Sequence, residues 1–332
     1  MRIGLSYDLK DDFVVDGLPE DAFEEYDSLE TIEALDNAIR AQGHDIVRLG
    51  GGRGFLERVL GAHVDFVFNI AEGRGNYRSR EAQVPAVLEM LDIPYSGSDP
   101  LTMAIALEKP LTKELVTRAG VTTPRWRLIN CLSEMDRWDW SDFPFPVFVK
   151  PAHEGSSKGI CLASRVTTLE ALRSLVQTQM ASYAQPIMVE EYISGDEVTV
   201  GMVGNSPPQV LGVMRVIPRT IQENFVYSLE VKRQWRELVS YECPAVLSEE
   251  TTRCLKEACL CIHKVLDVRD IARLDFRITS DGTPYFLEIN PLPGLNPQSG
   301  DIVLMSGMVG MSYNQLIAAI LDAAIRRYDN VS

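Results

Sequence analysis

The feature that most restricts the fold of this chain is a pair of alternating apolar and polar segments, 272–279 and 283–290, joined through Asp281-Gly282. Asp-Gly between two such segments is a strong signal for a β-hairpin with a two-residue turn. A turn of this kind fixes the register, so Asp275 is predicted to lie opposite Glu288, and Arg273 opposite Asn290. Successive side chains of a strand point to opposite sides, which puts these four on one face.

The two faces of the predicted hairpin differ in polarity. The apolar face collects Leu274, Phe276 and Ile278 against Ile289, Leu287 and Tyr285. On the polar face, Asp275 and Glu288 would repel each other at a Cβ separation of ~4.5–5.5 Å unless a cation lay between them. With the amide oxygen of Asn290 they form a hard oxygen set that suits Mg²⁺. A solvated strand face with an Arg–Asp pair is the alternative, although Gly294 indicates close approach of the backbone to a ligand.

A second informative segment is the loop 151–159, which follows a buried-type strand at 145–150. Gly155, Ser156, Ser157 and Gly159 offer backbone N–H groups and hydroxyls to an anion, and Lys150 adds a point charge. The segment is not a G-x-x-x-x-G-K-[ST] loop, and no G-x-G-x-x-G follows the first strand. An ordinary hairpin turn is the alternative interpretation.

The apolar segment 188–193 carries two acids in its middle and is followed by Glu197. A nucleotide base needs an apolar slot with exposed backbone groups, and a ribose needs a carboxylate nearby; this segment could supply both. It is equally compatible with a strand, a turn and a charged strand start. Lys109 and Lys113 fall on one predicted helix, and Lys109 taken by itself is more commonly a solvated lysine than a ligand.

Alternating strand and helix patterns in the first hundred residues predict a small parallel α/β domain. Asp27 is predicted to cap a helix that ends at Gly43, with Glu30 three residues after the cap. One helix is predicted over 101–119, strands dominate the middle of the chain, and helices are predicted at 249–266 and 313–327. A length of 332 residues allows two or three domains.

Composition excludes several classes of function. The formal net charge of −15 argues against binding to a phosphate backbone. No apolar run approaches the ~20 residues of a membrane helix, and the amino terminus lacks the pattern of a secretory signal. The six cysteines form no Cys-x-x-Cys pair. We therefore expect a cytoplasmic protein with reduced thiols and with neither nucleic-acid nor membrane partners.

Taken together, these motifs resemble the ATP-grasp superfamily, and most closely the D-alanine–D-alanine ligases. The matching segments cover essentially the whole chain: Lys109, 149–157, 190–197, 273–275, 288–299, and the landmarks 93–98 and 243–245. The resemblance implies an α/β chain, α+β in its ATP-grasp part, with three domains. These are an N-terminal parallel α/β substrate domain at 1–100, a central small subdomain at 101–193, and a C-terminal subdomain with the metal and catalytic site at 194–332.

The resemblance also implies roles for individual residues. The residues implied to bind ATP are Lys109, Lys150, Glu154, Ser156, Ser157, Glu190, Ile193 and Glu197. Asp275, Glu288 and Asn290 would hold two Mg²⁺ ions, which Mn²⁺ could replace. The catalytic group would be Arg273, the Gly294 backbone N–H and Ser156, with Arg273 and Gly294 stabilising a tetrahedral oxyanion. Ser299 would bind the carboxylate of the second substrate.

The chain departs from D-alanine ligases around the expected substrates. Its first loop is 7–12 rather than a glycine-rich segment, and Asp27 at the following helix start is a candidate substrate ligand. Glu72-Gly73 stands where the family has His-Gly. Arg233 falls where the family closes a tyrosine over the substrates, which suggests a substrate with an extra carboxylate or phosphate.

The leading hypothesis is an ATP-dependent, ADP-forming ligase that joins two amino-acid-like small molecules. A carboxylate would attack the γ-phosphate of ATP, and an amine would then displace phosphate from the acyl phosphate. The alternatives are D-alanyl-D-alanine synthesis for peptidoglycan proper, a non-catalytic ATP sensor with the same fold, and an intramolecular ring or amide product in a specialised pathway. A homodimer is suggested by the resemblance alone.

Overall fold

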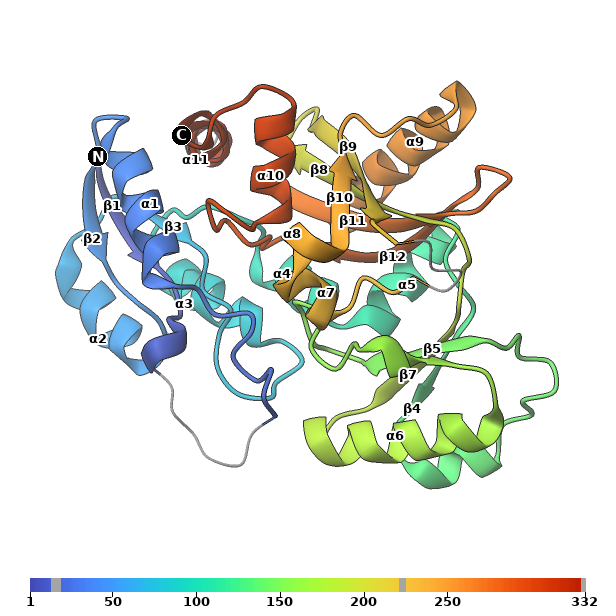
Figure 1. Cartoon of the computed structure of the whole chain (residues 1–332). Helices are drawn as coiled ribbons and strands as arrows, with labels where there is room; N and C mark the ends of the chain where they lie inside the picture. The colour runs from blue at the N-terminus through green and yellow to red at the C-terminus, as the bar shows by residue number, and fades with distance from the viewer. Residues whose placement is uncertain (13–18, 221–224, 330–332) are drawn as a thin grey trace.

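The computed structural model of this chain describes residues 1–12, 19–220 and 225–329. Their strands form three sheets, one parallel and two antiparallel, and helices pack on them (Figure 1). This mixed architecture confirms the predicted fold class. Each sheet lies within one of the three predicted domain ranges, while the exact boundaries remain a prediction.

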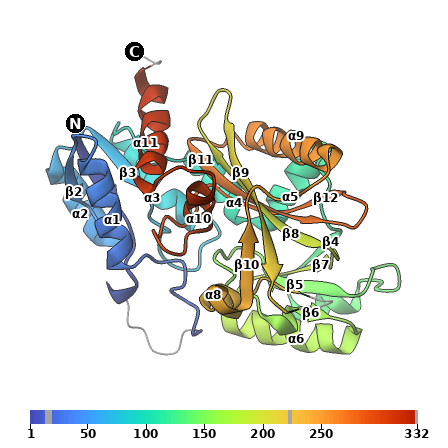
Figure 2. The same cartoon turned by 45° about the horizontal axis from the view of Figure 1, so that its top comes forward.

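The N-terminal sheet contains β1 (Arg2–Ser6), β2 (Asp45–Arg48) and β3 (Phe66–Asn69), all parallel, in the order β2-β1-β3. Parallel strands are normally covered on both faces. Here α2 (Gly52–Ala62) and α3 (Gln83–Met90) cover one face, and α1 (Leu29–Arg40) covers the other. The C-terminal helix α11 (Tyr313–Asp329) joins α1 in this core, as Figures 1 and 2 show.

The middle sheet has the order β4-β7-β5-β6, with β4 (Trp126–Ile129), β5 (Val147–Pro151), β6 (Arg165–Val166) and β7 (Ile187–Glu191). Helix α6 (Leu169–Tyr183) covers it, because Leu172 and Val176 pack on Val149 and Val189. Short 3-10 helices lie at Lys10–Asp12, Arg80–Ala82, Leu132–Asp136 and Leu162–Ser164. The loop 152–159 leaves this sheet at the end of β5.

The large sheet has the order β10-β9-β8-β11-β12 and is antiparallel. Its strands are β8 (Asp196–Val203), β9 (Gln209–Pro218), β10 (Val239–Glu242), β11 (Ile271–Ile278) and β12 (Pro284–Asn290). Helix α9 (Glu249–Val265) packs on one face, and α10 (Asp301–Met308) lies at the other. Helices α7 (Leu229–Arg233) and α8 (Trp235–Leu238) precede β10.

The predicted hairpin is present, and its register near the polar residues is confirmed. Arg273 pairs with Asn290 and Asp275 with Glu288. After Asp275 the register shifts by one, so Phe276 pairs with Phe286.

The predicted two-residue turn is therefore wrong, because Gly282 adopts a φ of +87° and closes a three-residue loop. Phe286 occupies the core in place of the predicted Leu287, and Leu287 lines a cavity.

The single helix predicted over 101–119 is also wrong, since the structure contains α4 (Pro100–Leu107) and α5 (Lys109–Arg118). Glu108 between them is not helical (φ −82°, ψ 85°). Proline has no backbone N–H and is tolerated only in the first turn of a helix, so Pro110 forces the helix to restart. Lys109 consequently begins a helix and is 6% exposed, which contradicts the solvated alternative.

No single helix in the described ranges is long and apolar enough to cross a membrane. Only α10 and α11 taken together pass that test of length and composition, and they meet at an angle of 111°.

Candidate active site

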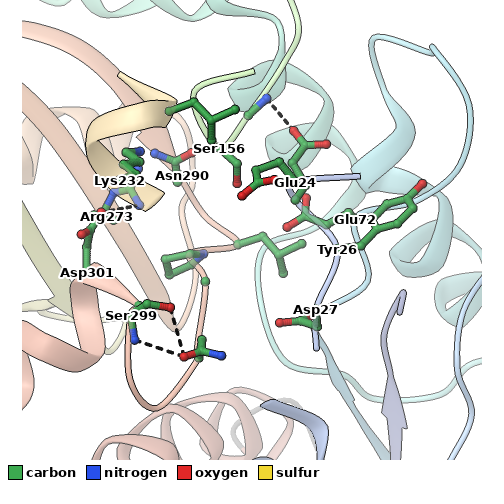
Figure 3. A pocket seen from close by; sticks show the side chains of 18 of the residues that line it. Glu24, Tyr26, Asp27, Glu72, Ser156, Lys232, Arg273, Asn290, Ser299 and Asp301 are labelled. Atoms are coloured by element: carbon green, nitrogen blue, oxygen red, sulfur yellow. Dashed lines mark hydrogen bonds and ion pairs between the residues drawn. The ribbon is translucent and has the colours of Figure 1, made fainter. Parts of the chain in front are cut away.

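Two cavities meet at the β11–β12 hairpin. The large cavity, of about 410 Å³, lies between the N-terminal segment 24–31 and the segment 290–301. The small cavity, of about 80 Å³, lies between the middle sheet and the large sheet. Five residues line both cavities: Tyr227, Lys232, Arg273, Glu288 and Asp301. Figure 3 shows the large cavity, with Arg273, Ser299 and Asp301 on one side and Tyr26, Asp27 and Glu72 on the other.

Every site residue proposed from the sequence lines one or both cavities. The large cavity is lined by Asp27, Lys109, Glu154, Ser156, Arg233, Arg273, Glu288, Asn290, Gly294 and Ser299. The small cavity is lined by Lys150, Ser157, Glu190, Ile193, Glu197, Arg273, Asp275 and Glu288. The structure thus brings together residues that are more than 200 positions apart in the sequence.

Lys150 and Glu190 line the small cavity, and Lys113 is buried next to Glu190. Nζ of Lys150 lies 2.6 Å from Oε1 of Glu190, and Nζ of Lys113 lies 3.1 Å from Oε2. Burial opposes ionisation of Glu190, but the two ammonium groups outweigh it and lower its pKa. Burial also lowers the pKa of Lys113 to about 8. Sequence analysis did not propose Lys113, although its spacing of four residues from Lys109 on one helix could have indicated it.

Glu197 also lines the small cavity. Its carboxylate forms an ion pair of 2.8 Å with Nη2 of Arg277, which also donates to the carbonyl of Phe225. Burial raises the pKa of Glu197, and the Arg277 guanidinium opposes that rise. Ile193 is buried beside it. The cavity therefore offers an apolar wall together with a carboxylate, as the sequence suggested for a nucleoside.

Arg273 and Asp275 share the polar face of the hairpin. Nη2 of Arg273 donates to Oδ2 of Asp275 at 2.8 Å, and Nη1 lies 3.2 Å from Oδ2 of Asp301. Thr199 on the adjacent strand donates to Oδ1 of Asp275 at 2.9 Å. Burial opposes the charge of Arg273, but Asp275 and Asp301 raise its pKa. Arg273 is thus a fixed cation at the junction of the two cavities.

The predicted metal ligands fit a magnesium ion. Asp275, Glu288 and Asn290 offer two carboxylates and an amide oxygen from the paired ends of β11 and β12. Burial opposes ionisation of Glu288, but the charges of Lys109 and Lys150 hold its pKa at about 2. No group of three or more His, Cys, Asp or Glu side chains in the described ranges could hold a metal. The two carboxylates and one amide oxygen of the hairpin suit Mg²⁺, because this ion takes one or two carboxylates together with substrate phosphates.

The loop 152–159 is held from several sides. Nζ of Lys109 donates to the carbonyl of Glu154, and the N–H of Gly155 donates to Oε1 of Glu25 at 2.5 Å. Ser156 and Ser157 both have left-handed backbone conformations, with φ of +47° and +61°. Their turn orients the loop between the two cavities, with Ser156 in the large one and Ser157 in the small one.

Arg233 lies at the edge of the large cavity, and its charge is already paired. Nη1 lies 2.8 Å from Oε1 of Glu20, and Nη2 lies 3.1 Å from Oε2 of Glu24. The hydrogen bonds that Arg233 donates to these two carboxylates raise its pKa. The role of Arg233 as a ligand for an extra acidic group therefore remains a prediction.

Asp27 is not the N-cap that the sequence suggested. Ser28 caps α1, and its Oγ accepts from the N–H of Thr31 at 3.3 Å. Ser28 has the extended backbone of an N-cap. Asp27, which does not cap the helix, lines the large cavity. There burial, with the charge of Asp8, raises the pKa of Asp27 to about 7. Ser299 lies across this cavity and donates to Oδ1 of Asn296.

Three further residues at the junction were missed by sequence analysis. Tyr227 donates or accepts at 2.7 Å with the hydroxyl of Tyr241, and its hydroxyl lies 3.3 Å from Oδ1 of Asp301. Lys232 lies 5.1 Å from the ring centre of Tyr227. The signal for Lys232 was its position beside Arg233, whereas nothing local marked Tyr227 or Asp301.

Comparisons with known proteins agree with this geometry. The family model described as D-ala D-ala ligase C-terminus matches residues 115–322. A D-alanine–D-alanine ligase of Aquifex aeolicus is 32% identical over 294 residues, covering 89% of this chain and 94% of that protein. The uncharacterized protein y4sG of Sinorhizobium fredii is 34% identical over 300 residues, covering 88% and 86%.

Two solved structures share the fold. The D-alanine–D-alanine ligase of Bacillus anthracis complexed with ATP has a TM-score of 0.73 at 23% identity, covering 99% of both chains. The VanG D-Ala:D-Ser ligase of Enterococcus faecalis has a TM-score of 0.74 at 21% identity, covering 97% of this chain and 99% of that one. The family model and the sequence matches above identify the chain as a member of the D-alanine–D-alanine ligase family, an ATP- and Mg²⁺-dependent, ADP-forming ligase.

Proposed function

We propose that this enzyme joins two amino acids into a dipeptide through an acyl phosphate, with the nucleotide in the small cavity and the amino acids in the large one. One observation carries this assignment: Arg273, Glu288 and Lys232 line both cavities, where a phosphoryl group would pass from one to the other. In this scheme a carboxylate oxygen attacks the γ-phosphorus and ADP leaves. The amine of the second amino acid then attacks the acyl carbon, phosphate leaves, and the amine loses a proton.

The side chains act mainly by position and charge in this proposal. Lys109 and Lys150 neutralise the phosphates, and the loop at Ser156 and Ser157 covers them. Arg273 and the backbone N–H of Gly294 stabilise the oxyanion of the tetrahedral intermediate. Asp275, Glu288 and Asn290 would hold Mg²⁺, which would add charge neutralisation at the phosphates.

The remaining residues of the proposed site bind the adenosine and the amino acids. Glu190, Ile193 and Glu197 hold the adenosine, and Glu154 anchors the phosphate loop. Ser299 binds the carboxylate of the second amino acid, and Asp27 and Arg233 complete the substrate wall. The relatives from Aquifex aeolicus and Maridesulfovibrio salexigens are D-alanine–D-alanine ligases, and D-alanyl-D-alanine is the first product to test.

The test is ADP release in the presence of ATP, Mg²⁺ and pooled D- and L-amino acids, with mass spectrometry for a product matched by ADP. Asp275→Asn and Lys150→Ala should each lower turnover by at least about 100-fold, since each removes charge that stabilises the transferring phosphoryl group. Circular dichroism would confirm that the variants fold. Unchanged turnover in both variants, or nucleotide binding without any product, would refute the ligase mechanism.

A homodimer, a cytoplasmic location and the domain boundaries 1–100, 101–193 and 194–332 belong to the same proposal. Light scattering coupled to size-exclusion chromatography tests the dimer directly. Limited proteolysis tests the boundaries, which predict cleavage near residues 100 and 193.

A further inference from the structure

The N-terminal side of the large cavity is unusually rich in carboxylates. Six acidic residues line it on this side: Glu24, Glu25, Asp27, Glu72, Glu81 and Glu154. The opposite side carries Arg273, Ser299 and the backbone of Gly294. An amino acid lying between the two sides would therefore meet opposite charge at its two ends.

Half of these carboxylates are already paired with cations of the protein. Glu25 and Glu154 share Arg80, whose Nη2 lies 2.8 Å from Oε1 of Glu25 and 3.1 Å from Oε2 of Glu154. Lys158 pairs with the same two carboxylates. Glu24 pairs with Arg233 at 3.1 Å. These groups need no cation from a substrate.

Glu81 is different, because it is buried and has no partner. Its exposed fraction is 7%, and its side chain lines the large cavity. In the parts of the chain that the structure describes it accepts no hydrogen bond and joins no ion pair. A buried carboxylate without a partner is costly and rare. Its orientation into a cavity therefore points to a ligand that supplies the missing charge.

Glu72 reinforces this site from a separate segment of chain. The segments of Glu72 and Glu81 are in close contact, since a Cβ on Gly73 would lie 2.0 Å from the carbonyl oxygen of Arg80. The side chain of Glu72 likewise has no ion pair or hydrogen bond in the described residues, and Figure 3 shows it on the wall opposite Arg273. Burial, with the charge of Glu81, raises its pKa well above the usual value. The charge of Arg80 opposes this rise, but its guanidinium is directed to Glu25 and to the carbonyl of His153.

We propose that the amino acid whose carboxylate reacts at Arg273 is dibasic, with a side-chain ammonium or guanidinium that binds Glu72 and Glu81. This inference rests on the ligase function proposed above and names one of its substrates. A neutral amino acid would bring a single positive charge, its α-ammonium, to a wall where Glu72, Glu81 and Asp27 all lack an ion pair. A second cation on the substrate would give the side chains of Glu72 and Glu81 the partner that they lack. The cavity of about 410 Å³ has the size of sites that bind small molecules.

The decisive experiment compares substrates that differ only in the distal cation. Lysine is paired with norleucine, ornithine with norvaline and arginine with citrulline, each in D and L forms, with ATP, Mg²⁺ and a pool of acceptor amino acids. ADP release gives KM and kcat, and the product mass shows which partner was activated. We expect at least one dibasic amino acid to exceed its neutral counterpart by at least about 10-fold in kcat/KM, the value of one charge-assisted hydrogen bond.

Variants then assign the preference to these carboxylates. Glu81→Gln and Glu72→Gln keep the side-chain shape, and each should raise KM for the dibasic amino acid by at least about 10-fold while KM for ATP stays unchanged. The preference over the neutral counterpart should shrink accordingly. Glu57→Gln is the matched control, because Glu57 is exposed on α2 and makes only a loose pair of 3.9 Å with Arg53.

The possible outcomes separate this inference from the ligase function. Equal or better turnover of the neutral amino acids would overturn it, as would a dibasic preference that survives both variants. If no amino acid releases ADP, the ligase function fails instead. Calorimetry with lysine and norleucine in the presence of ADP and Mg²⁺ then decides the inference: tighter lysine binding that is lost in Glu81→Gln supports it, and equal or absent binding refutes it.

Discussion

Replacing Glu81 by glutamine should make this protein more stable, and the gain should grow with pH. Most substitutions of buried residues destabilise a protein. Glu81 is an exception because the residue is 7% exposed and its carboxylate lacks a partner in the described residues. Burial is the main reason that its pKa rises from 4.5 to about 7, and the charge of Glu25 adds to the rise while that of Arg80 opposes it. Lys109 and Glu154 also face it.

The sign and size of this change in the free energy of unfolding follow from the linkage between proton binding and folding. A carboxyl whose pKa is higher in the folded than in the unfolded protein binds its proton more tightly when folded, so deprotonation favours unfolding. The penalty is absent below pH 4.5, grows as pH rises and is complete above pH 7. A shift of this size amounts to roughly 1 kcal/mol at pH 5.5 and roughly 3 kcal/mol at pH 8. Glutamine cannot ionise and removes this penalty.

Urea unfolding of the wild-type protein and of Glu81→Gln measures the difference in their free energies of unfolding at pH 5.5 and at pH 8. Glu57→Gln is the control, and its free energy of unfolding should stay within about 0.5 kcal/mol of wild type at both pH values. A Glu81→Gln protein that is less stable than wild type at pH 8 would refute the reasoning. A gain of equal size at the two pH values would refute it as well, because the cause would then not be the ionisation of Glu81.

Three further predictions test other parts of the structure. Arg327→Met should lower the free energy of unfolding by about 3–5 kcal/mol in urea at pH 7.5, because Asp270 is 0% exposed and would lose its ion pair of 2.7 Å; a loss below about 1 kcal/mol would contradict this. Arg233→Met should change that free energy by less than about 1 kcal/mol, since its pairs with Glu20 and Glu24 are near the surface; a larger loss would mean that the pairs hold the N-terminal segment in place. Excess EDTA should abolish ADP release and added Mg²⁺ should restore it; release that continues in EDTA would exclude a metal at Asp275 and Glu288.

The sequence predicted the polar face of the hairpin well because that face depends on local rules. Alternation decides which side chains share a face, and Asp281-Gly282 locates the turn, so the pairing of Arg273 with Asn290 could be derived. The bulge after Asp275 could not, because it depends on how Phe286 packs against Phe276 in the core. The break before α5 was visible in Pro110 but was outweighed by the helical pattern on both sides.

The sequence by itself determined which chemical groups are available, because the alternating hairpin and the loop of serines and glycines carry them. It also contained enough matching motifs to indicate the family. Only the tertiary structure decided which charges are neutralised. Arg80 follows Glu72 by eight residues and immediately precedes Glu81, yet it pairs with Glu25 and Glu154. Ion pairing acts through space and depends on distance and burial. The unpartnered carboxylates of the large cavity therefore became recognisable only when the chain was folded.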